Sequence, residues 1–494
     1  MPDITLSALT QPFAPAMNPL LSHAVMGKVP TGLTLDSRTV APGDAFIALS
    51  GHQLDGRQFV DEALMRGAMA VITEADAAQE PHPAIVAIPN LKLHVGEIAR
   101  RYFEDPSSEL SMIAVTGTNG KTSITDYIGQ LLRLLGESSG TIGTLGARTQ
   151  STQSVEALNT TPDVVSLNRC LAVWRDRGIR HVAIEASSHA LAQGRLNGLR
   201  IHTGVFSNLT RDHLDYHGDL DGYRQAKLKL FSDFALQRVI YNADDEATHG
   251  AIEVSSCPAV GVSLTDPLSD VHVKIISETT AGLTFRISSP LGTAEIATAL
   301  HGRFNAFNVS VAIMAVAGLG FAFREVAAAA AHLLPVEGRM QEVSSASDIR
   351  VVVDYAHTPD ALANSLGALA HSCTGSLWVV FGCGGDRDRG KRPDMGLIAS
   401  QLADRVIITN DNPRSEDPAA IANDIIAGCT SADVHIELDR AEAIRLAISS
   451  AAIGDTVLVA GKGHETYQQV GSERHSFSDA VFAERALRDR EVRL

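Results

Sequence analysis

Short apolar runs alternate with helix-length segments along most of this chain. The alternation is clearest in the last third, where four apolar runs occupy residues 349–353, 377–381, 405–408 and 456–460. Segments long enough for helices, such as 360–369 and 441–450, separate them. This rhythm is typical of strand–helix–strand units and predicts a largely parallel sheet that helices cover on both faces.

The pattern begins three times, which predicts three domains. The first stretch mixes short apolar runs at 44–49 and 68–73 with glycine and proline, as a small α/β domain does. The pattern restarts at a strand over 112–115 and again at residue 349. Because domains average roughly 150 residues, a chain of 494 residues suits an α/β protein with domains 1–110, 111–336 and 337–494.

One long uncharged apolar run, residues 309–323, raises the question of a membrane span. Ser310, Gly318 and Gly320 interrupt it, and it is too short to cross a bilayer comfortably. We therefore predict a buried helix at this position and no membrane span.

Composition narrows the class of protein. Lys and Arg number 41 against 57 Asp and Glu, and the resulting net charge of −16 argues against a protein that binds nucleic-acid phosphates or anionic membranes over a broad surface. The five cysteines form no C-x-x-C pair, so neither a disulfide framework nor a zinc ribbon is expected. No basic residue precedes Lys28, so we expect no secretory signal and a cytoplasmic protein.

A glycine loop with the order strand, loop, helix occupies residues 116–122 (TGTNGKT). The predicted helix 123–135 is amphipathic and is followed by Gly136, a frequent helix terminator. Backbone N–H groups at its start would hold phosphate oxygens, Lys121 would neutralise the β- and γ-phosphates, and the Thr122 hydroxyl would bind Mg²⁺. Two residues rather than four separate the glycines, so this is a shortened P-loop; an ordinary glycine turn with a solvated lysine is the alternative.

Polar clusters follow the predicted strands, where parallel sheets bind their ligands. A nucleotide loop implies Mg²⁺ and a carboxylate for it, and Glu185, directly after the run 182–184, is the candidate; a helix N-cap is the alternative reading of Glu185. Asp212 and His213 belong to a stretch with two aspartates and two histidines in six residues, and are candidate ligands or acid–base groups. This set indicates phosphoryl transfer or ATP-driven ligation.

Ten motifs in a fixed order carry a resemblance to a known family. They lie at residues 116–122, 159–162, 185–189, 208–218, 301–308, 338–339, 354–359, 382–388, 411–414 and 461–465. Together they resemble the Mur ligase family over about residues 35–465. Within it the pattern is most similar to the members that add meso-2,6-diaminopimelate to UDP-N-acetylmuramoyl-L-alanyl-D-glutamate.

The resemblance implies a division of labour among the three domains. The N-terminal domain would bind the UDP end of the substrate, the central P-loop-type ATPase domain would bind ATP and Mg²⁺, and a Rossmann-like C-terminal domain would bring the amino acid. ATP would phosphorylate the γ-carboxylate of the D-glutamyl residue, and the diaminopimelate amine would attack the acyl phosphate. We expect a monomer that uses these small molecules in peptidoglycan precursor synthesis.

The resemblance also implies which residues contact each substrate. The uridine and its diphosphate would be bound by Leu35, Ser37, His52, Gln53 and Leu54. The muramoyl peptide would be bound by Asn159, Thr160, Thr161, Ser187, Gln193 and Arg195. ATP would be bound by Gly117, Thr118, Asn119, Gly120, Lys121, Thr122, Asn305, Asn308, Arg339 and Asp354. Diaminopimelate would be bound by Arg387, Asp411, Asn412, Pro413, Arg414, Gly461 and Glu465.

Two of these assignments compete with simpler interpretations. Asn305 and Asn308 are three residues apart and share a helix face, but helix capping is an alternative role. Lys227 stands beside Lys229 on a predicted helix, where a lysine is ordinarily solvated. In the family the matching lysine is carbamylated by CO₂, so the resemblance implies that carbamylated Lys227 holds Mg²⁺ together with Thr122, Glu185 and His213, and that Lys121, Glu185, His213 and Lys227 are catalytic.

Specificity for diaminopimelate would come from Arg414. Diaminopimelate is lysine with one further carboxylate, which the guanidinium can bind in a bidentate manner, while Glu465 accepts from the distal ammonium and Arg387 assists. A sister amide ligase remains an alternative: a lysine-adding Mur ligase, the Mur ligase that adds D-alanyl-D-alanine, or a folylpolyglutamate synthase. A P-loop kinase or nucleotide-gated binding protein is a third possibility, but it leaves the motifs of the third domain without a purpose.

Overall fold

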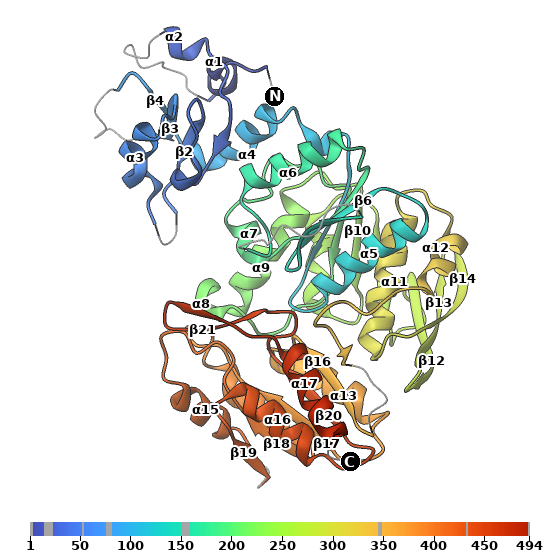
Figure 1. Ribbon diagram of the computed structural model, residues 1–494. Helices are drawn as coiled ribbons and strands as arrows, with labels where there is room; N and C mark the ends of the chain where they lie inside the picture. The colour runs from blue at the N-terminus through green and yellow to red at the C-terminus, as the bar shows by residue number, and fades with distance from the viewer. Residues whose placement is uncertain are drawn as a thin grey trace. The chain divides into compact units, whose positions relative to one another are not determined.

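The structure is a computed structural model that describes residues 3–13, 23–51, 54–75, 82–150, 159–343, 348–430 and 433–492. Its three larger sheets are formed by successive stretches of the chain, which Figure 1 draws in blue, in teal through green to yellow, and in orange to red. The alternation of apolar runs and helices predicted from the sequence is confirmed.

The first sheet has four parallel strands in the order β1 to β4. The strands are β1 (Leu33–Thr34), β2 (Ala45–Ala48), β3 (Ala70–Glu74) and β4 (Ile85–Ile88), and the helices are α1 (Leu6–Thr10), α2 (His23–Met26), α3 (Val60–Met65) and α4 (Leu91–Tyr102). Alternate residues of β2 face opposite sides: Ala45 and Ile47 pack in the cluster that contains α4, whereas Phe46 and Ala48 pack with α3. The sheet is therefore covered on both faces.

The second sheet has ten strands in the order β14-β13-β12-β11-β10-β9-β5-β8-β6-β7. They are β5 (Ser111–Thr116), β6 (Ser139–Gly143), β7 (Gly146–Thr149), β8 (His181–Glu185), β9 (Thr203–Phe206), β10 (Arg238–Asn242), β11 (Ala259–Ser263), β12 (Val271–Thr279), β13 (Gly282–Ser289) and β14 (Gly292–Thr298). Strands β12, β13 and β14 pair antiparallel, an extension that the sequence pattern did not predict.

Eight helices accompany these strands in the described chain. They are α5 (Lys121–Leu134), α6 (Val164–Asp176), α7 (Ser188–Ala192), α8 (Leu214–His217), α9 (Leu220–Ser232), α10 (Gly250–Val254), α11 (Arg303–Ala317) and α12 (Phe323–Ala330). The buried helix predicted over 309–323 is α11, which ends before Gly318 because Gly318 and Gly320 follow it; its side chains from Asn305 onward are buried. In the part of the chain that the structure describes, no helix is both long and apolar enough to cross a membrane.

The third sheet has six strands in the order β15-β16-β20-β17-β18-β19. They are β15 (Gln341–Glu342), β16 (Arg350–Asp354), β17 (Leu377–Phe381), β18 (Arg405–Ile408), β19 (Val434–Ile436) and β20 (Thr456–Ala460), with helices α13 (Pro359–Ala370), α14 (Lys391–Leu402), α15 (Pro418–Ile426), α16 (Arg440–Ser450) and α17 (Asp479–Glu491). All pairings are parallel except that of β15. Alternate side chains pack against α13–α15 on one face and α16 and α17 on the other, and the latter two are in front in Figure 1.

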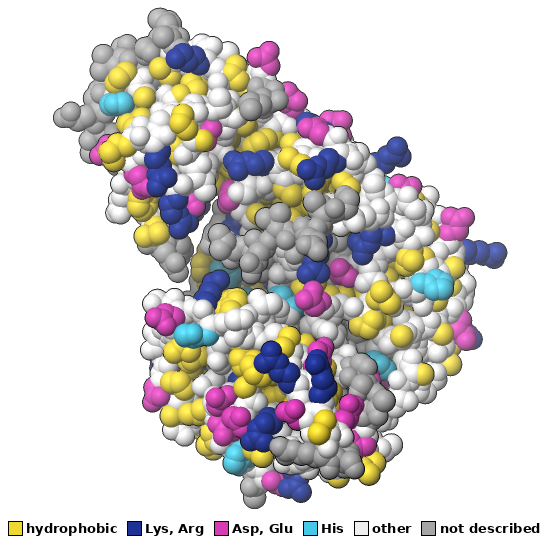
Figure 2. Space-filling view, viewed as in Figure 1, with side chains coloured by type: hydrophobic (Ala, Val, Ile, Leu, Met, Phe, Trp, Pro, Cys, Tyr) yellow, Lys and Arg dark blue, Asp and Glu magenta, His cyan; other side chains and the backbone are white. Residues whose placement is uncertain are grey.

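Contacts between Cα atoms divide the chain into two compact units. One comprises 1–114, 137–204 and 229–237; the other comprises 115–136, 205–228 and 238–494. The phosphate loop, the 208–218 motif and the whole six-stranded sheet thus belong to the second unit, and Glu185 belongs to the first. Basic and acidic side chains are interspersed on the face drawn in Figure 2.

Candidate active site

The phosphate loop joins β5 to α5 and has the backbone geometry of an anion-binding turn. Gly117 and Gly120 have φ angles of 147° and 84°, which favour glycine. A side chain at Gly117 would collide with the Ser207 hydroxyl. The Lys121 ammonium donates to the carbonyl oxygens of Gly117 at 2.9 Å and Thr118 at 2.8 Å, so it lies back over the loop.

Two groups from outside the loop hold its polar side chains. The Thr122 hydroxyl, proposed for Mg²⁺, accepts from Arg339 Nη2 at 3.1 Å. Asn119 donates through Nδ2 to Asp360 Oδ2 at 2.8 Å, and its backbone N–H donates to Asn208 Oδ1 at 2.8 Å. The loop is therefore braced by β9's following segment and by the start of α13. Sequence reasoning missed Asp360, because 241 residues separate it from Asn119.

Lys227 is not a solvated lysine. It is 1% exposed on α9, its Nζ donates to the Gly117 carbonyl at 2.7 Å, and it lies 4.2 Å from the centroid of the Tyr223 ring. Burial lowers the pKa of the Lys227 ammonium well below its usual range, the charge of Lys121 lowers it further, and Asp212 offsets this only in part. These surroundings disfavour the charged form of Lys227, and the side chain is held against the phosphate loop.

Asp212 is a buried carboxylate with a lysine and two histidines around it. Its carboxylate lies 3.4 Å from Lys391 Nζ, 3.6 Å from His357 Nε2 and 3.4 Å from His213 Nε2. Burial acts to raise the pKa of Asp212, but Lys391 and the two histidines outweigh it and hold the pKa well below its usual range. The cluster fixes Asp212 as a carboxylate. His213 has φ 55°, a left-handed conformation uncommon outside glycine.

Asn305 and Asn308 do not cap α11. Gly302 is the N-cap and makes no side-chain cap bond, while Asn305 accepts from the Tyr127 hydroxyl at 3.1 Å and donates to the His301 carbonyl at 2.7 Å. A Cβ at Gly120 would lie 2.9 Å from Asn308 Oδ1, so this asparagine lies directly against the phosphate loop.

Arg339 and Asp354 adjoin this group. The Arg339 guanidinium lies 4.2 Å from the Tyr355 ring centroid. Burial raises the pKa of Asp354, against the opposing effects of Arg339 and of hydrogen bonds from the Met340 N–H and the Ser365 hydroxyl. These residues provide aromatic, amide and carboxylate groups of the kind that recognise a nucleoside.

In the first unit, Glu185 anchors a separate network at the end of β8. Its carboxylate accepts from the Thr144 N–H at 2.7 Å and the Thr144 hydroxyl at 3.1 Å. The cap of α7 is Ser187, so the N-cap interpretation of Glu185 is wrong. A side chain at Gly143 would collide with the Glu185 carboxylate.

Most residues predicted for the muramoyl peptide surround Glu185. Thr161 donates to the Glu185 carbonyl at 2.7 Å, Arg195 donates to the Thr161 carbonyl at 2.7 Å and Gln193 accepts from Arg195 at 2.7 Å. The remaining members, Thr160 and Ser187, bond to Thr144 and Thr161 respectively. Asn159 is exposed.

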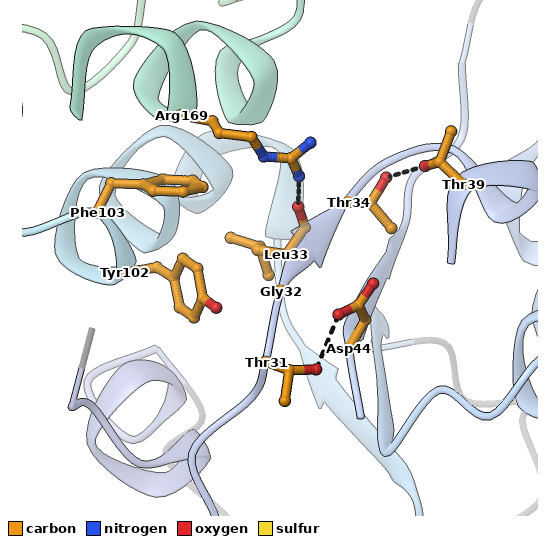
Figure 3. A pocket seen from close by; sticks show the side chains of 9 residues that line it. All are labelled: Thr31, Gly32, Leu33, Thr34, Thr39, Asp44, Tyr102, Phe103 and Arg169. Atoms are coloured by element: carbon orange, nitrogen blue, oxygen red, sulfur yellow. Dashed lines mark hydrogen bonds between the residues drawn. The ribbon is translucent and has the colours of Figure 1, made fainter. Parts of the chain in front are cut away.

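Of the residues predicted for uridine diphosphate, Leu35 and Ser37 lie between Thr34 and Thr39 in the sequence, and those two threonines line a pocket of the first unit. Ser37 is buried, Leu35 is half-buried, Leu54 is exposed, and His52 and Gln53 lie outside the described residues. The pocket beside β1, drawn in Figure 3, has a volume of about 330 Å³ and is lined by Thr31, Gly32, Leu33, Thr34, Thr39, Asp44, Tyr102, Phe103 and Arg169. Arg169 of α6 reaches the Leu33 carbonyl, so the pocket joins residues far apart in sequence.

The residues predicted for diaminopimelate meet at the carboxyl ends of β17, β18 and β20. Arg414, with φ 50°, donates through Nη1 to the Gly385 carbonyl at 2.7 Å. Burial and then the charge of Arg387 lower the pKa of Arg414, and the described residues form no salt bridge with it. Gly461 has φ 114°, and a side chain there would approach Asp411 Oδ2 to 2.8 Å.

Glu465 in the same group is tightly held. Its Oε2 accepts from Lys462 Nζ and from Asn412 Nδ2, both at 2.8 Å. Lys462 was not predicted, although it belongs to the 461–465 motif. Arg387 donates to the Asp386 carbonyl at 3.1 Å.

The donor set is compatible with Mg²⁺. The described residues contain no preassembled group of three His, Cys, Asp or Glu side chains for a metal. Mg²⁺ does not require one, since it binds through one or two carboxylates, substrate phosphates and water. The second unit offers the Thr122 hydroxyl at the start of α5 as an oxygen donor of the required kind, and the first unit offers the Glu185 carboxylate.

Comparisons with known proteins cover nearly the whole chain. Sequence models of the Mur ligase catalytic, middle and glutamate ligase domains match residues 30–102, 115–316 and 338–463. The chain is 44% identical to the UDP-N-acetylmuramoyl-L-alanyl-D-glutamate–2,6-diaminopimelate ligase of Chromobacterium violaceum (92% of this chain, 93% of that one), and 42% identical to that of Vibrio cholerae (98% of each).

Solved structures agree. A structure of a UDP-N-acetylmuramoyl-L-alanyl-D-glutamate–2,6-diaminopimelate ligase is similar with a TM-score of 0.70 and 36% identity, over 99% of this chain and 100% of that one. MurF from Acinetobacter baumannii shares the fold, with a TM-score of 0.67 at 19% identity over 92% and 95% of the two chains.

Proposed function

The chain belongs to the Mur ligase family, and on that basis we propose that it adds meso-2,6-diaminopimelate to the D-glutamyl γ-carboxylate of UDP-N-acetylmuramoyl-L-alanyl-D-glutamate. The names of its relatives support this substrate pair. The observation that carries the choice of amino acid is Arg414, a half-buried guanidinium to which the described residues offer carbonyl oxygens but no carboxylate. A bound carboxylate would supply the missing charge.

ATP would bind at the phosphate loop. The N–H groups at the start of α5 and the Lys121 ammonium would hold its phosphates, displacing the bonds from Lys121 to the loop carbonyls. Arg339 would turn from Thr122 toward the nucleotide, leaving that hydroxyl available. Asn305, Asn308 and Asp354 would contact the nucleoside.

Thr122, Glu185, His213 and carbamylated Lys227 would hold Mg²⁺, which when bound neutralises charge on the transferring phosphoryl group. The lowered pKa of Lys227 favours carbamylation, since CO₂ reacts with a free amine and not with an ammonium. The carbamate would place negatively charged oxygen donors where the Lys227 amine stands.

The chemistry would proceed in two steps. The γ-carboxylate oxygen attacks the γ-phosphorus of ATP, ADP leaves, and an acyl phosphate forms. The diaminopimelate amine then attacks the acyl carbon, phosphate leaves and the amine loses its proton. Arg414 and Glu465 would orient the amino acid, and Thr161, Gln193 and Arg195 would position the peptide.

The pocket beside β1, together with Leu35 and Ser37, would bind the UDP end of the substrate. We assign binding of the UDP end to domain 1–110, binding of ATP to domain 111–336 and binding of the amino acid to domain 337–494. Each of the three family matches falls within one of these ranges. An ATP-using enzyme with five free cysteines suits the cytoplasm.

One assay tests the proposal directly. ADP release is measured with the UDP-muramoyl dipeptide and, in turn, meso-diaminopimelate, lysine, D-alanyl-D-alanine and glutamate, and the product mass is determined. We expect release only with both substrates present and strongest with diaminopimelate. Equal use of lysine would reject the substrate assignment, and ADP release without the dipeptide would favour a different enzyme.

The intermediate has its own test. Hydroxylamine in place of the amino acid should yield a hydroxamate of the dipeptide, because an acyl phosphate is electrophilic. ATP hydrolysis with no trapped product, and no transfer of ¹⁸O from the carboxylate to phosphate, would exclude the acyl phosphate.

A further inference from the structure

Lys462 is a buried cation at the amino-acid site without an assigned role. It follows β20 and is 0% exposed. A buried ammonium is costly unless it is paired and hydrogen-bonded. Its Nζ lies 2.8 Å from Glu465 Oε2 and 3.1 Å from Asn412 Oδ1, and the Tyr467 ring centroid is 5.6 Å away.

Asn412 completes a closed ring of contacts. Its Oδ1 accepts from Lys462 and from the Gln469 N–H at 2.9 Å, and its Nδ2 donates to the same Glu465 oxygen that Lys462 contacts. The backbone donor at Gln469 fixes which way the amide points. Both ends of the Asn412 amide are therefore hydrogen-bonded within the protein.

The ring leaves Glu465 in one orientation. Two donors, one charged, converge on Oε2, and the carboxylate retains 18% exposure. Rotation of the Glu465 side chain would break both bonds and leave Lys462 without a counter-ion. Because Oε2 accepts both hydrogen bonds, the position of the other carboxylate oxygen, Oε1, is fixed as well.

We infer that Lys462 is a positioning residue for the amino-acid substrate, acting through Glu465; this rests on the proposed function. Lys462 and Asn412 hold Glu465 so that the distal ammonium of the incoming amino acid meets a carboxylate already in place. Preorganisation of this kind lowers the cost of ordering a side chain on binding.

The first measurement is a steady-state comparison of Lys462→Met with the unmodified enzyme. The KM for diaminopimelate should rise about tenfold or more, the loss expected when a charge-assisted contact is misplaced. The KM values for ATP and for the UDP-muramoyl dipeptide should stay within about twofold, because the other sites are untouched. An unchanged KM for diaminopimelate in folded Lys462→Met would overturn the inference.

A double variant shows whether Lys462 acts through Glu465. Glu465→Gln alone should raise the KM for diaminopimelate, and adding Lys462→Met should change it little further, because the positioned carboxylate is already gone. If the two effects multiply instead, Lys462 acts by another route and the inference fails. If Lys462→Met alone does not fold, Glu465→Gln is compared with the double variant only, which leaves no unpaired buried charge, and a further large rise in the KM for diaminopimelate would overturn the inference.

Arg490→Met is the matched control. Arg490 forms a largely buried ion pair with Asp348, at 2.7 Å, on the same six-stranded domain, where α17 carries it. Its loss should lower the Tm without changing the KM for diaminopimelate. If the unmodified enzyme does not use diaminopimelate at all, the proposed function fails. If it does use diaminopimelate and Lys462→Met has the same KM for it, only the role of Lys462 fails.

Discussion

Lys227 by the phosphate loop and Lys462 at the amino-acid site are both almost fully buried, yet their surroundings differ in charge. Lys462 lies 2.8 Å from a carboxylate. Lys227 contacts a backbone carbonyl, and among neighbouring charges the Lys121 ammonium has the largest effect on its pKa. Among the described residues, Lys227 forms no ion pair.

The difference separates two kinds of site. At the phosphate loop, the Lys121 ammonium contacts backbone carbonyl oxygens. An anionic nucleotide that binds there would supply the negative charge that this ammonium lacks. The amino-acid site pairs Lys462 with Glu465, whereas Arg414 donates to backbone carbonyls and forms no salt bridge with the described residues. We therefore expect substitutions at the loop to affect the chemical step most, and those at the second site to affect the choice of amino acid.

The largest effect should follow Lys121→Ala. It removes the charge that would stabilise the transferring phosphoryl group, and loss of one such stabilising group typically costs on the order of 10²–10³ in rate. The measurement is kcat for ADP release under saturating substrates, with circular dichroism to verify folding. Near-normal turnover by the folded variant would remove the loop from the mechanism.

Lys227 should show a dependence on CO₂. Lys227→Ala should lose activity on the order of 10²-fold, whereas Lys227→Glu, which restores a carboxylate, should retain more. The unmodified enzyme should weaken in carbonate-free buffer and recover with bicarbonate. Because burial keeps the pKa of Lys227 low, recovery should fail only as the pH falls through that lowered pKa and the amine becomes protonated.

Activity that is indifferent to bicarbonate at neutral pH would contradict the carbamate. Lys229→Ala is the matched control for this experiment, because Lys229 lies on the same helix with an exposed side chain. It should respond to bicarbonate as the unmodified enzyme does.

The phosphate loop and Lys227 also differ in how far the sequence predicts them. The phosphate loop was predictable because strand, glycines, lysine and helix are consecutive, and strands such as β17, β18 and β20 were found at their exact limits from their apolar runs. The burial of Lys227 was not predictable from the residues next to it in the sequence, since Lys227 packs against Gly117, which is 110 residues away. Only the resemblance singled it out.

Long-range partners account for most of what was missed. Asp360 braces Asn119, Lys391 pairs with Asp212, and Arg169 closes the pocket beside β1, over 241, 179 and 136 residues of separation. The antiparallel strands β12–β14 were missed for a different reason: they interrupt a strand–helix rhythm that continues on either side. Local periodicity predicts which residues form a helix or strand and which side of it is buried, but it does not predict which loops contact one another in the folded chain.

The next effect concerns discrimination between amino acids. Arg414→Ala should reduce kcat/KM for diaminopimelate by about 10²-fold, the cost of losing a bidentate carboxylate contact at about 1.4 kcal/mol per factor of ten. Use of lysine should change much less, since lysine lacks the second carboxylate. The readout is the ratio of the two kcat/KM values, with the KM for ATP as the control. Equal losses for both amino acids would show that Arg414 only supports the loop.

The smallest effect is on stability, and its sign should differ between the two lysines. Lys462→Met leaves the Glu465 carboxylate without its cation. Breaking a buried pair costs about 3–5 kcal/mol, and less here because Glu465 keeps 18% exposure, so the Tm should fall by several degrees.

Lys227→Met should instead raise the Tm in carbonate-free buffer. The pKa of Lys227 is lower in the folded than in the unfolded chain, so between those two pKa values the unfolded chain binds the extra proton and stability rises with pH. Replacing the amine removes that penalty, and the gain should be larger at pH 6.5 than at pH 9. Differential scanning calorimetry of both variants at the two pH values measures this. A fall in Tm for Lys227→Met at both pH values would mean that its bond to the Gly117 carbonyl outweighs desolvation, and the contrast between the two buried lysines would then lie in chemistry alone.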